Sequence, residues 1–275
     1  MSTDGEYIHG FGANEMQRLT RLQQLLNDAE LELLDLSEVH SVLDVGAGLG
    51  QMTRAIARRA GPGVRVLGIE RDARQREEAA RQAAAAGEAR LVEMRAGSAL
   101  ALPLEPGERG SFDLAHARFL LEHVTDPQAV VNEMVAAVRP GGRIALLDDD
   151  HDLLRLWPDE PTVARAWEVY WRSYERIGCD PLVGRRFAGL LASAGAEVVR
   201  LTTIFYGASR GMPHFDLVVD NLAGVLVSAQ AQLDSSGRFS TAQMQHALDC
   251  LQAWRQRPGA SVWYSLPFAE GRRPR

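Results

Sequence analysis

The residues whose types and spacing allow chemistry follow short apolar runs. The first such stretch, residues 41–50, reads SVLDVGAGLG, so that Asp44 lies in an apolar run and Gly46, Gly48 and Gly50 alternate after it. Glycine adopts backbone angles that other residues avoid, so this turn lets a ligand approach the main-chain N–H groups closely. A strand, a glycine turn and a helix in that order form a cradle for a nucleotide-like ligand.

The glycine spacing restricts the kind of ligand. A dinucleotide-binding fingerprint requires G-x-G-x-x-G, but Gln51 stands where the third glycine would fall. No G-x-x-x-x-G-K-[ST] run occurs, which excludes a P-loop. The next apolar run, residues 64–69, ends in Glu70, twenty residues after Gly50. A carboxylate at that strand end can accept hydrogen bonds from both hydroxyls of a ribose.

With VLDVGAGLG, the chain resembles the class I S-adenosylmethionine-dependent methyltransferases at their first motif. The resemblance implies S-adenosylmethionine as cofactor, held by Asp44, Gly46, Gly48, Gly50, Glu70 and Arg71. It also implies a second cofactor loop at Gly97, Ser98 and Ala99, where the family usually has G-D-A. A hydroxyl at position 98 accepts a hydrogen bond from the adenine amino group more weakly than a carboxylate does. Arg118 is predicted to bind a cofactor carboxylate or an anionic substrate.

The acidic run DDDHD, residues 148–152, follows a strand predicted at residues 143–147. Neighbouring carboxylates raise one another's pKa and histidine titrates near neutrality, so Asp150 and His151 are the candidate catalytic residues. They could take a proton or hold a divalent cation, but we assign no metal site. An acidic strand end is also commonly a solvated loop, and this alternative stays open.

Aromatic residues are predicted to line the substrate site. Trp167, Tyr170 and Trp171 belong to a helix expected over residues 162–177, for which core packing is the alternative. The N-terminal pattern Y-x-H-G, followed by E-x-x-R-L, resembles the arm of many bacterial and fungal small-molecule methyltransferases. In that family the arm folds over the cofactor cleft, so Tyr7 is predicted to be a lid residue.

An α/β framework is needed to bring these strand ends together. We predict a Rossmann-like, doubly wound, mostly parallel seven-stranded sheet with an antiparallel last strand and added cap helices. The strands are expected at residues 42–45, 64–69, 90–95, 112–117, 143–147, 197–206 and 261–268, and the tail 271–275 is expected to be disordered. A single domain is predicted over residues 1–275, with an arm (1–38), an α/β core (40–207 and 260–269) and a helical cap insertion (208–259).

The composition favours an ordinary globular protein with a small-molecule partner. Hydrophobic residues make up 46% and charged residues 24% of the chain, and the net charge of −6 does not favour a broad cationic face for nucleic acid. The two cysteines, Cys179 and Cys250, lack the spacing of a metal site or a disulfide scaffold. A polar N-terminus and the lack of an apolar run of ~18 residues predict a cytoplasmic protein without a membrane span.

Taken together, these patterns predict S-adenosylmethionine-dependent methyl transfer to a small apolar or aromatic acceptor. The lack of a [DN]-P-P-[YF] motif after the fourth strand disfavours methylation of amino groups on nucleic-acid bases or glutamine. Two alternatives remain. One is a cofactor-binding protein of this fold whose pocket catalyses another reaction or senses a metabolite, and the other is an RNA or protein methyltransferase, which the acidic balance opposes.

Overall fold

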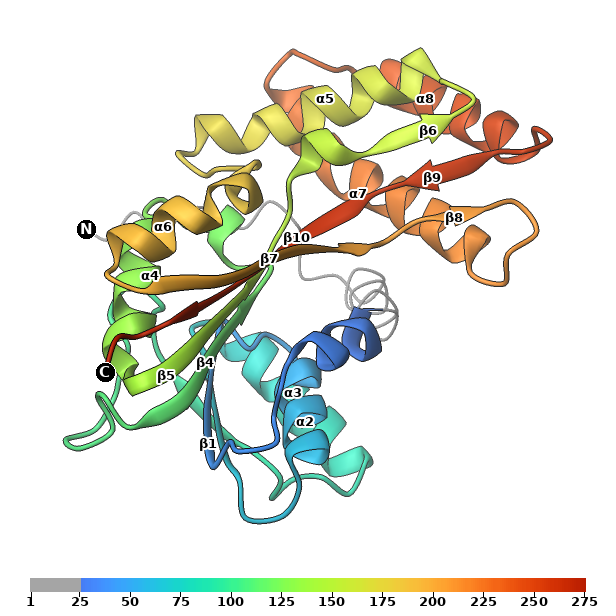
Figure 1. The fold of residues 1–275 in the computed structure, drawn as a ribbon. Helices are drawn as coiled ribbons and strands as arrows, with labels where there is room; N and C mark the ends of the chain where they lie inside the picture. The colour runs from blue at the N-terminus through green and yellow to red at the C-terminus, as the bar shows by residue number, and fades with distance from the viewer. Residues whose placement is uncertain (1–25) are drawn as a thin grey trace.

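A seven-stranded sheet forms the centre of the computed structural model, which describes residues 26–275 (Figure 1). In spatial order its strands are β3 (Glu93–Ala96), β2 (Arg65–Glu70), β1 (Ser41–Val45), β4 (Phe112–Arg118), β5 (Val138–Leu147), β10 (Ser265–Arg272) and β7 (Glu197–Phe205). The strands from β3 to β5 pair in parallel, whereas β10 runs antiparallel to β5 and β7. The predicted mostly parallel, seven-stranded sheet with an antiparallel last strand is therefore confirmed.

Helices cover both faces of this sheet. One core cluster lies between α2 (Gln51–Ala60) and buried strand residues such as Val42 and Leu114. The other lies beneath α4 (Pro127–Ala137) and α6 (Phe187–Ser193), which occupy the opposite side of the sheet (Figure 1). Side chains that alternate along each strand thus enter two separate apolar layers, as expected for a sheet buried on both faces.

Local sequence signals define where several helices begin. The Asp72 side chain accepts a hydrogen bond from the Gln75 N–H at the start of α3 (Ala73–Ala85). Asp126 caps α4 in the same way, with a proline in its first turn. A capping box of Ser240 and Gln243 opens α8 (Thr241–Arg255). Each cap satisfies backbone N–H groups that have no partner within the helix.

A cap stands above the carboxyl ends of the central strands (Figure 1). It contains α5 (Pro161–Arg176), α7 (Phe215–Ser235) and α8, which pack through buried residues including Leu226, Met244 and Trp254. Three short strands accompany these helices, and only Ala208–Ser209 of them falls within the helical insertion predicted over residues 208–259. A second sheet in the order β6 (Arg155–Trp157), β9 (Ser261–Trp263) and β8 (Ala208–Ser209) lies beside these helices.

Several predicted boundaries are corrected by the structure. The strand expected at 261–268 is divided into β9 and β10, with Tyr264 between them. β5 begins at Val138, five residues before the predicted start, because α4 ends at Ala137. The prediction of a disordered tail is wrong for Gly271, which pairs with Val198 and Ile144 in β10. The guanidinium of Arg273 then donates to the Val138 carbonyl oxygen at 2.7 Å, which holds the chain end against the core.

The N-terminal arm enters the described part of the chain as a helix over residues 26–33. Leu26 and Leu34 are buried in the core cluster on the α2 side of the sheet. Tyr7 and most of the predicted arm lie outside the described residues. The division of the chain into arm, core and cap therefore stays a prediction. Within residues 26–275, no helix is both long and apolar enough to cross a bilayer.

Candidate active site

A large cavity opens at the carboxyl ends of β1, β2 and β4, between the sheet and the cap. The strand order reverses between β1 and β4, and ligands of open α/β sheets bind at such a switch point. Predicted residues on its wall are Gly46, Gly48, Glu70, Arg71, Gly97, Ser98, Ala99, Arg118, His151, Trp167 and Tyr170. The fold thus brings together side chains from strand ends that are far apart in the sequence.

The glycine turn forms one wall of the cavity. Gly46 and Gly48 have φ angles of +73° and +54°, in the left-handed region that favours glycine. A Cβ atom on Gly46 would lie 2.8 Å from the Leu120 Cδ1 atom, so a side chain there would displace the end of Leu120. The N–H groups of Gly46 and Ala47 both donate to the Ile69 carbonyl oxygen at 2.9 Å. We expected the N–H groups of the turn to bind a ligand, but these two N–H groups are already used within the protein. The turn therefore contributes space for a ligand.

Glu70 lies at the end of β2, with its carboxylate on the cavity wall. Its two oxygens accept hydrogen bonds from different backbone N–H groups, at 3.0 Å from Gly48 and 2.8 Å from Asp72. These bonds fix the plane of the carboxylate. Each carboxylate oxygen has a second lone pair, so the side chain can still accept from two hydroxyl groups. This geometry fits the predicted contact with a ribose.

Asp44 and Gly50 do not line the cavity, although both were predicted to contact the cofactor. Asp44 is buried behind the glycine turn, where its Oδ1 atom lies 2.7 Å from His116 Nδ1. Gly50 has a φ angle of +65° and forms the N-cap of α2. The structure thus places these two residues where they hold the turn and the start of the helix.

A buried hydrogen-bonded network, here called the His116 network, connects β1 and β4 with the helix at 26–33. It comprises Asn27, Glu30, Asp44, His116 and Arg118. His116 Nε2 lies 2.7 Å from Glu30 Oε1, and Arg118 donates to the other Glu30 oxygen at 2.9 Å. Burial lowers the pKa of His116, but the carboxylates of Glu30 and Asp44 have the larger combined effect and raise this pKa to about 9. His116 is therefore a cation at neutral pH.

The second predicted cofactor loop, residues 97–99, lies on the cavity wall next to Glu70. A Cβ atom on Gly97 would lie 2.3 Å from Pro103 Cγ, so the close approach of these segments requires glycine. The Ser98 hydroxyl oxygen accepts a hydrogen bond from the Leu100 N–H at 3.2 Å. One of its acceptor positions is thus already used within the loop, while its hydrogen stays available.

The other half of the cavity lies under the cap and is largely aromatic. Trp167 and Tyr170 of α5 are on its wall, as predicted for substrate-lining residues. The cap and the last strands add Tyr206, Asn221, Val225, Tyr264 and Leu266. Trp171 does not line the cavity, because it points into the core with the Arg172 guanidinium 4.6 Å from its ring centre. Core packing, the alternative considered above, therefore describes Trp171.

Asp150 also lies outside the cavity wall, in contrast to His151. Its carboxylate forms two bonds with the guanidinium of Arg185, at 2.7 and 2.6 Å. This paired arrangement uses both carboxylate oxygens, so the placement of Asp150 does not fit the predicted catalytic role. The residue next to it, Asp149, is on the cavity wall instead.

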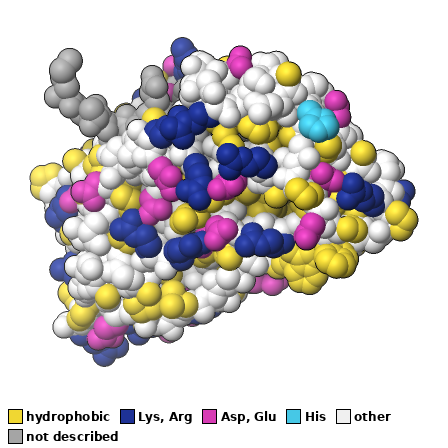
Figure 2. All heavy atoms as spheres, turned by 90° about the horizontal axis from the view of Figure 1, so that it is seen from above, with side chains coloured by type: hydrophobic (Ala, Val, Ile, Leu, Met, Phe, Trp, Pro, Cys, Tyr) yellow, Lys and Arg dark blue, Asp and Glu magenta, His cyan; other side chains and the backbone are white. Residues whose placement is uncertain are grey.

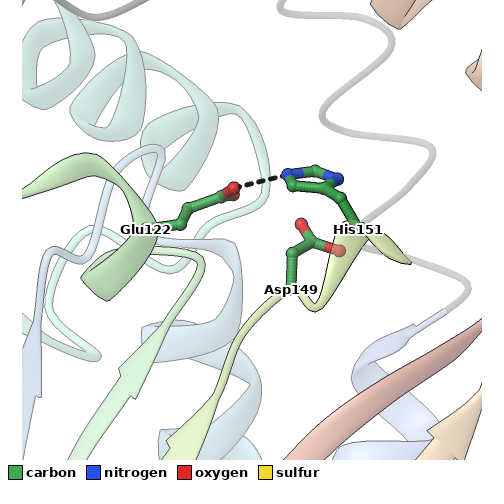
Figure 3. Close-up of side chains that lie close together, drawn as sticks. All are labelled: Glu122, Asp149 and His151. Atoms are coloured by element: carbon green, nitrogen blue, oxygen red, sulfur yellow. Dashed lines mark hydrogen bonds and ion pairs between the residues drawn. The ribbon is translucent and has the colours of Figure 1, made fainter. Parts of the chain in front are cut away.

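Four buried polar side chains meet at the aromatic half of the cavity, and we call them the Glu122 cluster: Glu122, Asp149, His151 and Tyr264. Figure 3 shows Glu122 and His151 facing each other, with the Asp149 carboxylate directed towards the gap between them. His151 Nε2 lies 2.8 Å from Glu122 Oε2, and His151 Nδ1 lies 3.3 Å from the Tyr264 hydroxyl. That hydroxyl donates a short hydrogen bond to Asp149.

Burial determines which members of the Glu122 cluster carry protons. It raises the pKa of Glu122 well above the usual range, and the adjacent Asp149 charge adds to this effect. Burial also lowers the pKa of His151, which is therefore neutral at pH 7. Burial raises the pKa of Tyr264, again reinforced by Asp149. The cluster thus retains its protons on Glu122 and Tyr264.

Three members of the Glu122 cluster were not predicted from the sequence: Glu122, Asp149 and Tyr264. Glu122 follows β4 within a short 3₁₀ turn, Leu121–His123, so an acid after a strand end was a signal that could have identified it. Asp149 stood in the acidic run, but only the structure distinguishes it from its neighbours. Tyr264 had no comparable signal, because it lies between two strands that had been predicted as one.

Comparison with known proteins identifies the class of fold first. The chain resembles the solved structure of the [4+2]-cyclase SpnF, with a TM-score of 0.56 at 18% identity over 92% of this chain and 82% of that one. A geranyl diphosphate C-methyltransferase from Streptomyces coelicolor gives a TM-score of 0.54 at 14% identity over 92% of this chain and 78% of that one. These similarities show the Rossmann-like methyltransferase fold.

The sequence comparison then adds a match over part of the chain. Residues 43–146 match the family model described as a methyltransferase domain. This part of the chain is thus similar to a methyltransferase domain, in agreement with the fold. A ubiquinone/menaquinone biosynthesis C-methyltransferase from Hahella chejuensis is 32% identical over 47% of this chain and 49% of its own length. An uncharacterized transposon protein of Streptomyces fradiae is 32% identical over 65% of this chain and 50% of its own. The chain spans about half the length of these relatives.

Proposed function

We propose that this protein transfers a methyl group from S-adenosylmethionine to a small apolar or aromatic molecule. The observation that carries this proposal is that one cavity joins two different surfaces. The glycine turn, Glu70 and the 97–99 loop form one surface, and the aromatic residues with the Glu122 cluster form the other. A cofactor and an acceptor bound in the same cavity can be aligned for direct transfer.

The first surface fits the adenosyl part of the cofactor. Glu70 would accept hydrogen bonds from the two ribose hydroxyls, and the glycine turn would leave room for the sugar and the amino-acid part. Ser98 would contact the adenine, while Arg71 and Arg118 would stand near the charged end of the cofactor. When bound, this cofactor supplies an electrophilic methyl group on a sulfonium.

The second surface fits the acceptor. Trp167, Tyr170 and Val225 provide flat and apolar walls, which favour binding of an aromatic molecule and exclude water. Water exclusion matters because it strengthens the electrostatic interactions that orient the reacting groups. No covalent intermediate on the protein is needed, since alignment alone supplies much of the rate enhancement.

Binding of S-adenosylhomocysteine tests the cofactor surface. We expect millimolar S-adenosylhomocysteine to raise the melting temperature of the wild-type protein, and Glu70→Ala to abolish the shift. Glu77→Ala is the matched control, because Glu77 is an exposed acid on α3 outside the cavity wall. If the wild-type protein shows no shift, the proposed function is wrong.

Transfer itself is tested with methyl-labelled S-adenosylmethionine and a small-molecule cell extract. Mass spectrometry of the labelled product would identify the acceptor. A second function is favoured by the similarity to a protein described as a [4+2]-cyclase, namely another reaction in a cofactor-containing pocket. Bound cofactor without transfer of label would support that alternative.

Nucleic acid is not the favoured acceptor. The face seen from above carries arginine and acidic side chains that are interspersed, with apolar residues between them (Figure 2). Binding to a phosphate backbone depends on neutralisation of many phosphates by clustered cations. A steep decrease of RNA binding with salt concentration would be needed to restore the RNA methyltransferase alternative.

A further inference from the structure

The Glu122 cluster forms a continuous hydrogen-bonded chain with its end at the cavity. It runs from Glu122 through the ring of His151 to the Tyr264 hydroxyl and then to the Asp149 carboxylate. Glu122, Asp149 and His151 are each buried, and all four members line the cavity. A buried polar chain of this kind is costly to maintain unless every member is satisfied, so its place beside the acceptor surface calls for a chemical explanation.

The donor of each hydrogen bond in this chain follows from the bond between Tyr264 and the Asp149 carboxylate, which can only accept. Tyr264 donates its hydroxyl hydrogen to Asp149, so its oxygen is left to accept from His151 Nδ1–H. A neutral imidazole with its hydrogen on Nδ1 has a lone pair on Nε2, which accepts from the protonated carboxyl of Glu122. Every donor then meets an acceptor, and Asp149 is the member of the chain that is left as a carboxylate.

We propose that Asp149 is the catalytic base of the reaction and that the acceptor reacts through a neutral group X–H, either a phenolic or enolic hydroxyl or an acidic C–H of an aromatic molecule. Glu122, His151 and Tyr264 act as positioning residues that hold the carboxylate and its protons in place. This inference rests on the proposed function, since it names the class of acceptor for the same cavity.

The proposed step balances in atoms and charge. The electron pair of X forms the bond to the methyl carbon, the S–CH₃ bond breaks and its electron pair returns to sulfur. The X–H bond also breaks, and its proton goes to the Asp149 carboxylate. A sulfonium cation and a carboxylate anion are thus converted to a neutral thioether and a neutral carboxyl group. No oxidant, reductant or metal ion is required.

The charge of the site explains why the reacting group enters in its neutral form. Glu122, Asp148 and Asp149 lie close together, and burial together with their mutual repulsion raises the pKa of Asp148 well above the usual range. Glu122 and Asp148 therefore keep their protons, and an anionic oxygen at this place would be repelled by the Asp149 carboxylate. His123, Arg71 and Tyr170 also line the cavity. Burial, reinforced by the charge of Arg71, lowers the pKa of His123 to about 3, so Arg71 is the cation among these three residues.

The same residues could be considered as a metal site, since ligand atoms of Glu122, Asp149 and His151 lie within 4.8 Å of one another. The hydrogen bonds favour protons instead. His151 uses Nε2 towards Glu122 at 2.8 Å and faces Tyr264 with Nδ1, so neither ring nitrogen is directed to a shared central point. Asp149 is likewise bonded to the Tyr264 hydroxyl. A metal ion would have to break these bonds.

The test measures transfer from methyl-labelled S-adenosylmethionine to a small-molecule cell extract, with the wild-type protein, Asp149→Asn and Asp149→Glu. We expect Asp149→Asn to lower kcat about 100-fold, which is the scale of a general base, without changing S-adenosylhomocysteine affinity. Asp149→Glu should recover part of this loss. Asp152→Asn is the matched control, because Asp152 is an exposed acid three residues further on that does not line the cavity.

Each outcome supports or contradicts the role of Asp149 as the catalytic base. A product that is a methyl ether or a C-methyl compound, with the rate loss described, supports it. A product that keeps all acceptor hydrogens, such as a sulfonium or quaternary ammonium compound, overturns it, as does an Asp149→Asn variant with the wild-type rate. Loss of transfer on treatment with a chelator, restored by a divalent ion, would show a metal site instead. If the wild-type protein binds S-adenosylhomocysteine but transfers no label, Asp149 is not a catalytic base, although the cofactor site is correct. If it does not bind S-adenosylhomocysteine, the proposed function itself is wrong.

Discussion

Two buried histidines in this protein each lie next to acidic side chains, but they differ in charge. His116 contacts a carboxylate through both ring nitrogens, at 2.7 Å from Asp44 and 2.7 Å from Glu30. Both nitrogens can donate only in the imidazolium form, in agreement with the pKa of about 9. His151 contacts a carboxyl through one nitrogen and the Tyr264 hydroxyl through the other, and burial lowers its pKa. Similar residue types therefore produce one charged and one neutral histidine.

The difference between the two regions lies in how their negative charge is compensated. In the His116 network, the cations His116 and Arg118 face the carboxylates of Glu30 and Asp44. In the Glu122 cluster, Glu122 instead keeps its proton. Arginine cannot give up its charge, whereas a carboxyl proton can leave or return. The first region is thus suited to hold the fold together, and the second can exchange protons with a molecule in the cavity.

Replacement of the charged histidine should give the largest effect on stability. His116→Leu leaves Glu30 and Asp44 buried without their shared cation, which should lower the free energy of unfolding by about 3–5 kcal/mol. Urea denaturation at pH 7 measures this loss. The control is His246→Leu, an exposed histidine on α8, which should change the free energy by less than about 0.5 kcal/mol. Equal losses in the two variants would mean that the His116 network contributes no special stability.

The same two variants can also test how the free energy of unfolding depends on pH. The pKa of His116 is raised in the folded state from 6.5 to about 9, so its contribution is fully present below pH 6.5 and is lost as the pH rises through 9. The wild-type protein should therefore lose stability over this range, and the His246→Leu variant should follow it. His116→Leu should show a flatter curve. Identical curves for all three proteins would contradict a charged His116.

Much of the framework could be predicted because its signals are local. The glycine turn, Glu70 and the helix caps at Asp72 and Asp126 each depend on residues a few positions apart. A strand pattern followed by a helix pattern likewise fixes a parallel sheet through the geometry of the crossover. The small second sheet was not predictable in this way. Its three strands contain two or three residues each, and their partners are more than 50 positions apart in the sequence.

The acidic run shows why the site was predicted only in part. The Asp148 carboxylate accepts hydrogen bonds from the backbone N–H groups of Leu120 and Leu121, while the Asp150 carboxylate pairs with the guanidinium of Arg185. Only Asp149 of these three carboxylates lines the cavity. The sequence contains all three side by side, but the partners of Asp148 and Asp150 lie 26 to 35 positions away and Tyr264, the partner of Asp149, lies 115 positions away. The choice among them depends on tertiary contacts that local patterns do not contain.

Tyr264→Phe removes one hydroxyl from the Glu122 cluster and has no counterpart in the His116 network. The ring keeps its packing, but the Asp149 carboxylate loses a donor, so kcat should fall about tenfold. Label transfer at pH 7 measures this change. Tyr174→Phe is the control, since it removes a buried hydroxyl bonded to Tyr170 from a residue that does not line the cavity. A matching loss in this control would assign the effect to packing.

Glu122→Gln should have the smallest effect, because the amide resembles a protonated carboxyl. Its NH₂ group can donate to His151 Nε2 as the Glu122 carboxyl does, so label transfer should stay within about threefold of the wild-type rate.

Stability provides the second measurement for Glu122→Gln. Glu122 has a pKa that is raised in the folded state, so the wild-type protein loses stability as the pH rises above 4.5, whereas the variant has no such titration. The melting temperature of Glu122→Gln relative to wild type should therefore increase with pH. Glu122→Ala, which supplies no donor, should lose both activity and stability. If Glu122→Gln fails as Glu122→Ala does, then Glu122 is ionised in the folded protein, and His151 must donate to it as His116 donates to its own two carboxylates.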